Sequence, residues 1–358
     1  MKGVPLPAQY SPRTIPGLLA ERATDRPAAV AAFGKGRAGY AAVTFAELAD
    51  SARRLAGGLV ERGVVPGDRV AWLLDNSRGL DALQLFHAVV WAGGVNVPIN
   101  PRLAPPEVAD IVQRTGSRLL IAQPEYRSRA AECLVSASVI SVDELAEQSP
   151  ATPRRAATAE ATDLTTASIL FTSGTTGRPK GVVHTHGSSI AAAIGWSDAL
   201  ALAPGDVLQS PFPVFSGAGL HFNGLSCLWA GCEFVIDDYG TAASLELAGA
   251  RQTSVYVAVP SIYAFWLDSP VLDATTLRSL RVLDYGGAAM APALIRQLRE
   301  RLPGVGLVQT YGLTEAGPGG TYLPAEDALV RLGSIGRRCA GEFTEFRVVD
   351  ADGQNVVG

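Results

Sequence analysis

Along the first third of the chain, apolar residues form one pattern with helical spacing and several short runs. Between Leu48 and Leu59 they return every three or four positions, which predicts a helix over 44–62 with one buried face. Thr44 and Glu47 at its start match a capping box. Other apolar runs have the length of short buried strands or helices, at 69–74, 80–91, 95–99, 105–114 and 118–122. Strands that alternate with helices in this way predict a parallel sheet with helices on both faces.

The same alternation returns in the second half of the chain. A helix over 188–202 precedes a strand at 207–209, and a strand at 281–285, a helix at 292–301 and a strand at 305–310 follow. The stretch 211–220 contains too many prolines and glycines to be regular structure. Alternating apolar residues predict a half-buried strand over 342–350, and Asp352-Gly353 then makes a hairpin turn.

Composition suggests where the chain divides. Residues 149–166 are mostly alanine, threonine, proline and arginine, which pack poorly and indicate a linker. We therefore expect a first α/β subdomain over 1–165 and a second over 166–332, with 333–358 forming the beginning of a β-rich, barrel-like subdomain that is truncated.

The overall composition excludes several classes of function. With 30 basic against 34 acidic residues, the surface offers no general attraction for nucleic acid. The 4 cysteines are scattered, which argues for a reducing compartment and against a zinc site, and the 4 histidines are not arranged as metal ligands. The start of the chain has no signal-peptide pattern, and the most apolar window, 85–99, is too short and broken to span a bilayer. We expect a cytoplasmic protein.

The most informative stretch is a polar loop between two apolar runs, at residues 172–181. Gly174 and Gly177 let backbone N–H groups turn inward, and side-chain donors would hold a polyanion. Those donors are Thr172, Ser173, Thr175, Thr176 and Lys180. The spacing does not fit the common P-loop, and a β-branched run follows where that motif has a helix. A flexible surface loop rich in small residues is the alternative interpretation.

Two further segments follow the predicted strands at 281–285 and 305–310. Because ligands bind at the carboxyl ends of strands in open α/β sheets, both are candidate site segments. The small residues at 286–289 would let a purine lie against the backbone, and Tyr311 offers a ring to stack on it. Glu315 is a carboxylate suited to magnesium, although a lone glutamate at a strand end is usually only a solvated charge.

Together, the polar loop and the segments at 286–290 and 311–317 resemble the motifs of the adenylate-forming superfamily, which includes acyl-CoA synthetases. The resemblance implies that the loop holds the β- and γ-phosphates of ATP, with Thr175 and Lys180 in catalytic roles. It implies that Thr314 contacts the α-phosphate and that Glu315 binds Mg²⁺. The adenine would lie against Gly287, Ala288, Ala289, Tyr311 and Gly312. The carboxylic acid would enter beside Phe215, Ser216, Gly219 and Gly286.

The chain departs from the superfamily pattern in three places. Ser216 stands where many acyl-CoA synthetases have histidine, and no carboxylate stands in 211–220 to pair with the ammonium of an amino acid. The Tyr-x-Thr-Gly-Asp segment is absent, and so is the C-terminal domain with its lysine. We therefore expect adenylation to be weakened by several orders of magnitude and CoA transfer to be inefficient. The chain would be either a truncated piece or a naturally shortened product.

The resemblance implies ATP-dependent activation of a fatty or aryl carboxylic acid, followed by thioester formation with CoA. Transfer to a carrier protein is one alternative. A non-catalytic module that binds nucleotide or acyl ligand is the other. ATP, Mg²⁺ and CoA are the expected cofactors or co-substrates, and a homodimer is possible. The sequence leaves open the identity of the acid and the oligomeric state.

Overall fold

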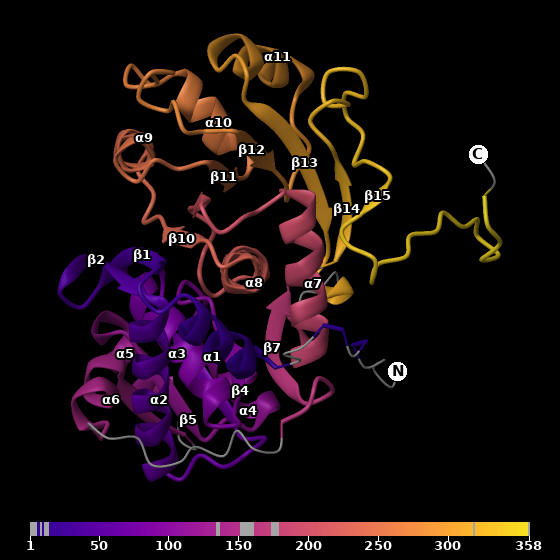
Figure 1. Ribbon diagram of the computed structural model, residues 1–358. Helices are drawn as coiled ribbons and strands as arrows, with labels where there is room; N and C mark the ends of the chain where they lie inside the picture. Colours follow the sequence, from indigo (N-terminus) through magenta and orange to yellow (C-terminus); the bar gives the residue numbers. More distant parts are fainter. Residues whose placement is uncertain are drawn as a thin grey trace.

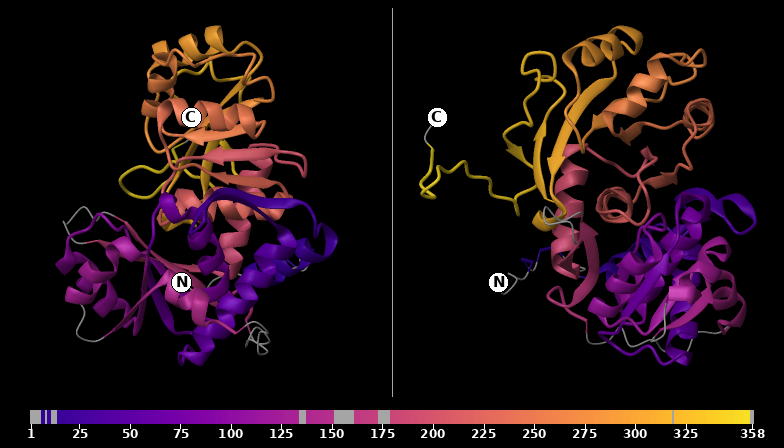
Figure 2. Two further views of the ribbon diagram at one scale, coloured as in Figure 1. Left: turned by 90° about the vertical axis from the view of Figure 1, so that its left-hand side faces the viewer. Right: turned by 180° about the vertical axis from the view of Figure 1, so that it is seen from behind.

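The computed structural model describes residues 6–7, 9–10, 14–133, 137–150, 161–172, 179–317 and 319–356. The protein consists of two lobes, each built around one sheet, with α7 (His186–Ala199) rising from the lower lobe toward the upper one (Figures 1 and 2). The mixed α/β architecture with helices flanking parallel sheets confirms the fold class predicted from the sequence.

The lower sheet has six strands in the order β6-β5-β3-β4-β7-β8, all parallel except β8, which runs antiparallel to β7. Its strands are β3 (Arg69–Leu73), β4 (Val95–Pro98), β5 (Leu119–Ala122), β6 (Ser138–Ser141), β7 (Thr166–Thr172) and β8 (Lys180–Thr185). One face packs on α4 (Pro105–Thr115) and α5 (Pro124–Cys133). The other packs on α2 (Phe45–Glu61), α3 (Gly79–Trp91) and α6 (Val142–Gln148).

The upper sheet has nine strands in the order β15-β14-β13-β12-β11-β9-β10-β1-β2. Their bounds are β1 (Val30–Gly36), β2 (Gly39–Thr44), β9 (Val207–Ser210), β10 (Glu233–Ile236), β11 (Val255–Ala258), β12 (Val282–Tyr285), β13 (Gly306–Gly312), β14 (Gly320–Leu323) and β15 (Arg338–Cys339). One face packs on α9 (Thr241–Ala250), α10 (Pro260–Leu267) and α11 (Pro292–Arg301). The other packs on α7, α8 (Leu225–Ala230) and the π-helical segment η3 (Gly217–Gly224).

The sheets exchange strands across residue 165, where the sequence predicts a subdomain boundary. β1 and β2, from the first 50 residues, extend the upper sheet through parallel pairing of β1 with β10. β7 and β8, from beyond the predicted linker, extend the lower sheet through pairing of β7 with β4. Since backbone pairing follows the sheet rather than the chain order, the lobes are not two consecutive segments. The proposed division into subdomains stays a prediction.

Several local predictions are confirmed. Thr44 caps α2, with the reciprocal bonds of a capping box to Glu47. The helix predicted at 292–301 is α11, which has proline at its first position. The strand predicted at 305–310 is β13, which extends further and includes Tyr311 and Gly312, because it also pairs with the antiparallel strand β14.

Two predictions are wrong. Only the first part of 211–220 is irregular, since η3 begins at Gly217. The half-buried strand at 342–350 is not formed: a single bridge joins Val349 to Asn355, and Phe346 and Val348 are 47% and 58% exposed. The alternation there has no partner strand among the described residues against which to pack. The turn at Asp352-Gly353 is present.

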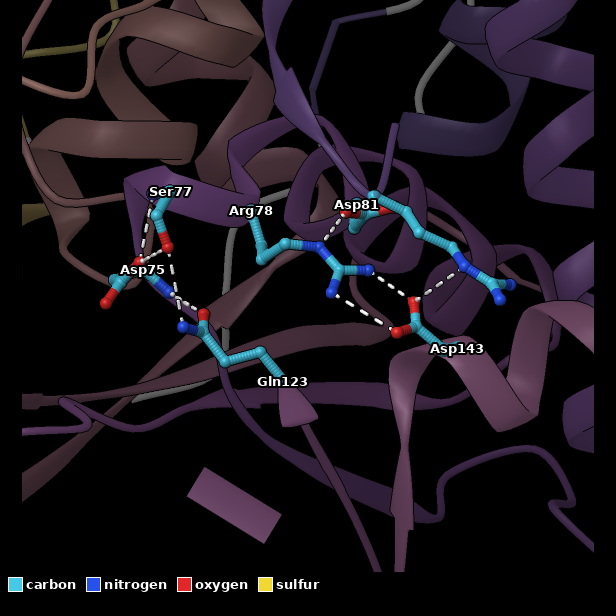
Figure 3. A network of polar contacts seen from close by, with 7 residues as sticks. Asp75, Ser77, Arg78, Asp81, Gln123 and Asp143 are labelled. Carbon is cyan, nitrogen blue, oxygen red and sulfur yellow. Dashed lines mark hydrogen bonds and ion pairs between the residues drawn. The ribbon is translucent and has the colours of Figure 1, made fainter. Parts of the chain in front are cut away.

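A polar network anchors the start of α3 to the rest of the lower lobe. Arg78, in the short helix η1 (Asn76–Arg78), reaches both Asp81 on α3 and Asp143 on α6, as Figure 3 shows. Beside it, Asp75 accepts bonds from Ser77 and from the hydroxyl of Tyr126.

None of the helices in the described part of the chain combines the length and the apolar character that a bilayer-spanning segment needs.

Candidate functional site

The end of β7 and the turn after β13 meet, although they lie far apart in the sequence. Thr172 Oγ1 donates a hydrogen bond to Glu315 Oε1 at 3.0 Å. Glu315 belongs to the short helix η4 (Thr314–Ala316), directly after β13. Lys180 lies opposite Thr172 in the β7–β8 ladder, so both side chains project from the same face. A hydroxyl, a carboxylate and an ammonium group thus occupy one exposed rim.

Six residues of the predicted loop at 172–181, residues 173–178, lie outside the described residues. They include the predicted phosphate-binding residues Ser173, Gly174, Thr175, Thr176 and Gly177. The described residues on either side, Thr172 and Lys180, pair directly with each other, so β7 and β8, which flank the loop, are adjacent antiparallel strands.

Residues 287–289, which we call the shelf, follow β12 and are exposed. β12 and β13 run parallel, and Tyr285 pairs with Gln309, so the segments that follow them start at the same edge of the sheet. Gly287 has φ of +73°, a left-handed conformation that favours glycine. Ala288 and Ala289 are exposed, and Tyr311 is 37% exposed. The structure therefore brings together the small residues and the aromatic ring that the sequence singles out.

Two cavities open beneath the rim and the shelf. The larger, about 450 Å³, lies beside the end of β7. Its wall includes Thr172, Phe215, Ser216, Gly217 and Thr314. The smaller, about 130 Å³, lies on the face of the upper sheet. It is lined by Trp196, Phe212, Gly217, Ala218, Phe222, Gly286, Gly287, Thr310, Gly312 and Thr314. Gly217 and Thr314 belong to both walls, so the cavities adjoin each other.

The segment that enters η3 separates the two cavities. Ser216 caps η3: its hydroxyl accepts from Gly219 N and donates to Pro213 O. Gly219 lines neither cavity. A Cβ atom on Gly219 would lie 2.1 Å from Pro213 O, so this position requires glycine for close packing. Of the predicted acid-binding residues, Phe215, Ser216 and Gly286 line cavity walls, whereas Gly219 supports the backbone.

Asn76 holds this segment in place, and the sequence analysis missed it. Its side-chain amide donates to Phe212 O at 3.1 Å and to Asp237 O at 2.8 Å, and its Oδ1 accepts from Val214 N at 2.9 Å. Asn76 thus joins the lower lobe to the stretch that leads into Phe215. The sequence feature that could have identified Asn76 is its position just beyond the strand at 69–74, at the ligand-binding edge of a parallel sheet.

Two polar residues on the sheet were also missed. Asp284 on β12 is fully buried, and burial raises the pKa of its carboxyl group well above the usual value. Thr310 on β13 lines the smaller cavity and donates to Asp284 Oδ2 at 3.1 Å. The sequence feature that could have identified Asp284 is a lone carboxylate within an otherwise apolar strand.

Three buried histidines have strongly lowered pKa values. Burial lowers the pKa of His221 and of His87 to about 3 and that of His184 to about 4, so all three are neutral at neutral pH. His221 Nε2 lies 2.9 Å from Ser168 Oγ, and the rings of His184 and His221 are 5.6 Å apart. Within the described residues, no group of histidine, cysteine and acidic side chains could hold a metal ion by itself.

Comparison with known proteins gives a consistent result. Residues 19–358 match the AMP-binding enzyme family. The chain is 34% identical over 318 residues to the long-chain-fatty-acid–CoA ligase FadD13 of Mycobacterium tuberculosis, an alignment that covers 87% of this chain and 62% of the ligase. It is 32% identical over 331 residues to a feruloyl-CoA synthase of Amycolatopsis, which covers 89% of this chain and 64% of that enzyme. The chain thus spans less than two thirds of the length of these relatives.

Solved structures agree with the sequence comparisons. A fatty acyl CoA synthetase of Mycobacterium tuberculosis superposes with a TM-score of 0.85 at 30% identity, over 96% of this chain and 68% of that one. The o-succinylbenzoate CoA synthetase of Bacillus subtilis, solved in complex with AMP, gives a TM-score of 0.82 at 26% identity, over 95% of this chain and 67% of that one.

Proposed function

The chain belongs to the AMP-binding enzyme family, and on that premise we propose that its cleft binds MgATP and a carboxylic acid and joins them as an acyl-adenylate. The observation that carries the proposal is the hydrogen bond between Thr172 and Glu315, next to Thr314, which belongs to the walls of both cavities. A rim of polar groups beside an apolar pocket suits a reaction between a nucleotide and an apolar acid.

The proposed reaction requires two anions to approach each other. A carboxylate oxygen attacks the α-phosphorus of ATP, and the bond to pyrophosphate breaks. The rim would lower the barrier by positioning the reactants and by neutralising charge. Lys180 supplies a cation, and the donors of the loop at 172–177 supply hydrogen bonds to the β- and γ-phosphates. Thr314, on the wall shared by the two cavities, lies where the α-phosphate would meet the acid.

Glu315 fits the proposed role of magnesium ligand. It is an exposed carboxylate, and hard divalent cations prefer oxygen ligands of this kind. Thr172 Oγ1 donates to one carboxylate oxygen, which restrains the orientation of the side chain. When bound, Mg²⁺ would offset the charge of the phosphates.

The shelf would hold the adenine. Gly287, Ala288 and Ala289 present little side-chain bulk, and Tyr311 places an exposed ring nearby. A flat base can stack on such a ring and contact the backbone of the shelf at the same time. Gly312, at the end of β13, leaves room for the ligand between the shelf and the smaller cavity.

The acid is proposed to be fatty or aryl, because similar proteins are named for a long-chain fatty acid, for feruloyl-CoA and for indoleacetate. CoA is the proposed acceptor for the same reason. Transfer to a carrier protein would use the same first step. The cytoplasmic location and a possible homodimer stay predictions.

A non-catalytic module that binds nucleotide or acyl ligand is the main rival. It would use the same cleft, so binding alone does not separate the two. We propose measuring the affinity for ATP by calorimetry with and without Mg²⁺. ATP–pyrophosphate exchange is then measured with a panel of fatty and aryl acids. Magnesium-dependent binding with acid-dependent exchange supports the ligase, and binding without exchange supports the module. An absence of MgATP binding would contradict the ligase and the nucleotide-binding form of the module.

A further inference from the structure

The upper sheet ends in a strand that has no neighbour on its outer side. β2 is the last strand in the order, next to β1. In an antiparallel ladder, every second residue of an edge strand directs its N–H and C=O groups away from its partner. No other strand pairs with β2 in the described part of the chain, and Tyr40, Ala41 and Ala42 are exposed. The hairpin of β1 and β2 lies at the left-hand edge of the molecule in Figure 1, so this row of groups is open to a partner.

β2 also lacks the features that protect most edge strands from pairing. Such strands are usually very short, or they carry charged residues or proline. β2 has six residues, none of them charged and none proline, and its pairing with β1 is regular from Gly39 to Val43. The other sheet edges are better protected, because β8 begins with Lys180, β15 has two residues, and β6 has four. Among the edges that the structure describes, β2 is therefore the one best suited to pairing with another chain.

An aromatic side chain beside this edge is a second feature typical of an interface. Tyr40 is 53% exposed, and its ring stacks on that of Phe33 on β1 at a centroid distance of 5.7 Å. The centre of the Phe33 ring in turn lies 4.5 Å from the guanidinium carbon of Arg251. Phe33 pairs with Ala42, two positions from Tyr40, so both rings lie on one face of the hairpin. A tyrosine held in this way offers contact area at little cost in side-chain entropy.

The pattern of charge favours a second copy of this chain as the partner. When two identical strands pair antiparallel about a twofold axis, residues near the axis lie opposite their own copies. A charged residue there would repel itself, and the middle of β2 has Ala41 and Ala42 instead. Arg37 precedes β2 and Glu47 follows it, so antiparallel pairing brings unlike charges together at the strand ends. Because Arg37 also pairs with Glu147 and Glu47 caps α2, this attraction is only a small addition.

We infer that β2 is a self-association edge, at which two copies of the chain pair antiparallel and join their nine-stranded sheets into one. Since side chains alternate between the two faces, the twofold axis passes beside a residue that lies opposite its own copy, and Ala41 and Ala42 are the central ones. The contact buries few side chains, so the dimer forms in the micromolar range. The inference does not depend on the proposed function. β13 and β2 lie toward opposite ends of the strand order, so pairing leaves both clefts open.

Sedimentation velocity of the chain over a range of concentrations tests the inference. The wild-type chain should show a monomer–dimer equilibrium. Ala42→Lys should weaken self-association by at least about tenfold, because two ammonium groups then meet near the axis. Ala41→Lys, on the other face of the strand, tests the same edge and serves if the first variant does not fold. Ala274→Lys, at an exposed alanine outside both sheets, is the control and should leave the equilibrium unchanged. A monomeric wild-type chain, or a dimer that both variants of β2 retain, would overturn the inference.

Mixing oppositely charged variants distinguishes a second copy from any other partner. Ala42→Lys and Ala42→Glu should each be monomeric alone and should form a heterodimer when mixed in equal amounts, because unlike charges then meet near the axis. The same pair of substitutions at Ala41 covers an axis at that residue. Mixtures that stay monomeric at both positions would overturn the twofold arrangement.

Ligand affinities separate this inference from the proposed function. Ala42→Lys should bind MgATP and benzoyl-sulfamoyl adenosine, a mimic of an acyl-adenylate, within about twofold of the wild-type affinities, since β2 contributes nothing to either cavity wall. A wild-type dimer that does not bind MgATP would remove the proposed function and keep this inference. A wild-type monomer that binds MgATP would do the reverse.

Discussion

The exposed rim and the buried cavity beneath it are built in opposite ways. The rim gathers Thr172 and Lys180, from adjacent strands of the lower sheet, and Glu315, which follows β13 of the upper sheet. The cavity lies on the face of the upper sheet that α7 and η3 cover, and its wall includes Trp196, Phe222 and Thr310. In the proposed function, the rim performs the chemistry common to any acid, and the cavity decides which acid is used.

The difference also concerns how each region is stabilised. Rim residues make few contacts, so their substitution should change ligand binding and leave the fold intact. Cavity residues are part of the core, so their substitution should change stability and acid selection together. The variants below test that contrast.

The largest effect is expected for Trp196→Ala. The side chain is fully buried against Phe222, and truncating a buried tryptophan costs about 3–5 kcal/mol of unfolding free energy. The enlarged cavity should also raise the affinity for mimics of longer acids. Urea denaturation measures the first effect and calorimetry the second. Phe265→Ala, at a 54% exposed position, is the control and should cost less than about 1 kcal/mol. An unchanged acid preference in the folded tryptophan variant would contradict the assignment of the cavity.

The next largest effect is expected for Asn76→Ala. It removes three side-chain hydrogen bonds and leaves Phe212 O, Asp237 O and Val214 N without that partner. We expect a loss of about 2–4 kcal/mol in unfolding free energy and weaker binding of acyl mimics, with a smaller change for ATP. Gln297→Ala, on the exposed face of α11, is the matched control. Equal loss of ATP and acyl affinity would show that Asn76 supports the rim as much as the cavity.

Glu315→Gln and Lys180→Ala change the rim alone. Loss of a charge-assisted contact costs about 1.5–3 kcal/mol, so MgATP affinity should fall by about tenfold to a hundredfold. The urea midpoint should hardly move, because both side chains are exposed. Glu300→Gln on α11 removes an equally exposed carboxylate and should leave MgATP affinity unchanged. If it weakens binding as much as Glu315→Gln, the effect is one of overall charge.

The smallest effect is expected for the pH dependence of stability, to which the buried histidines contribute. Burial lowers the pKa of His221 to about 3, below its value in the unfolded chain, so the unfolded state binds more protons between these values. Stability should therefore decrease as pH falls below about 6.5, by up to about 1.4 kcal/mol per pH unit for each such histidine. Asp284, whose pKa is raised by burial, acts in the opposite direction. His221→Gln should reduce the slope measured by urea denaturation between about pH 5 and pH 6.5. An identical slope would mean that His221 does not titrate this way.

The segments at 286–290 and 311–317 could be placed from the sequence because each directly follows a predicted strand. Thr314 and Glu315 follow one strand, and Gly286 and Gly287 follow another, so period and position were sufficient to place them at one edge. The helices at 44–62 and 292–301 could also be predicted, because the caps, prolines and apolar periodicity that indicate them lie within each segment.

The cavity could not be predicted in this way. Its wall comes from α7, η3, β12 and β13, and their approach depends on which sheet each strand joins. The pairing of β1 with β10 and of β7 with β4 crosses the predicted linker, and no local pattern announces it. Asp284 was visible as a charge within an apolar strand, but only the pairing with Val257 and Val308 shows the face to which it points.

A crystal structure of this chain with a benzoyl-sulfamoyl adenosine tests the central claim most directly. The account predicts the adenine between the 287–289 shelf and Tyr311, the sulfamoyl group beside Thr314, and the ring in the smaller cavity. A ligand bound away from this cleft would contradict the proposed function. A ring in the larger cavity beside Phe215 would contradict the assignment of the acid pocket.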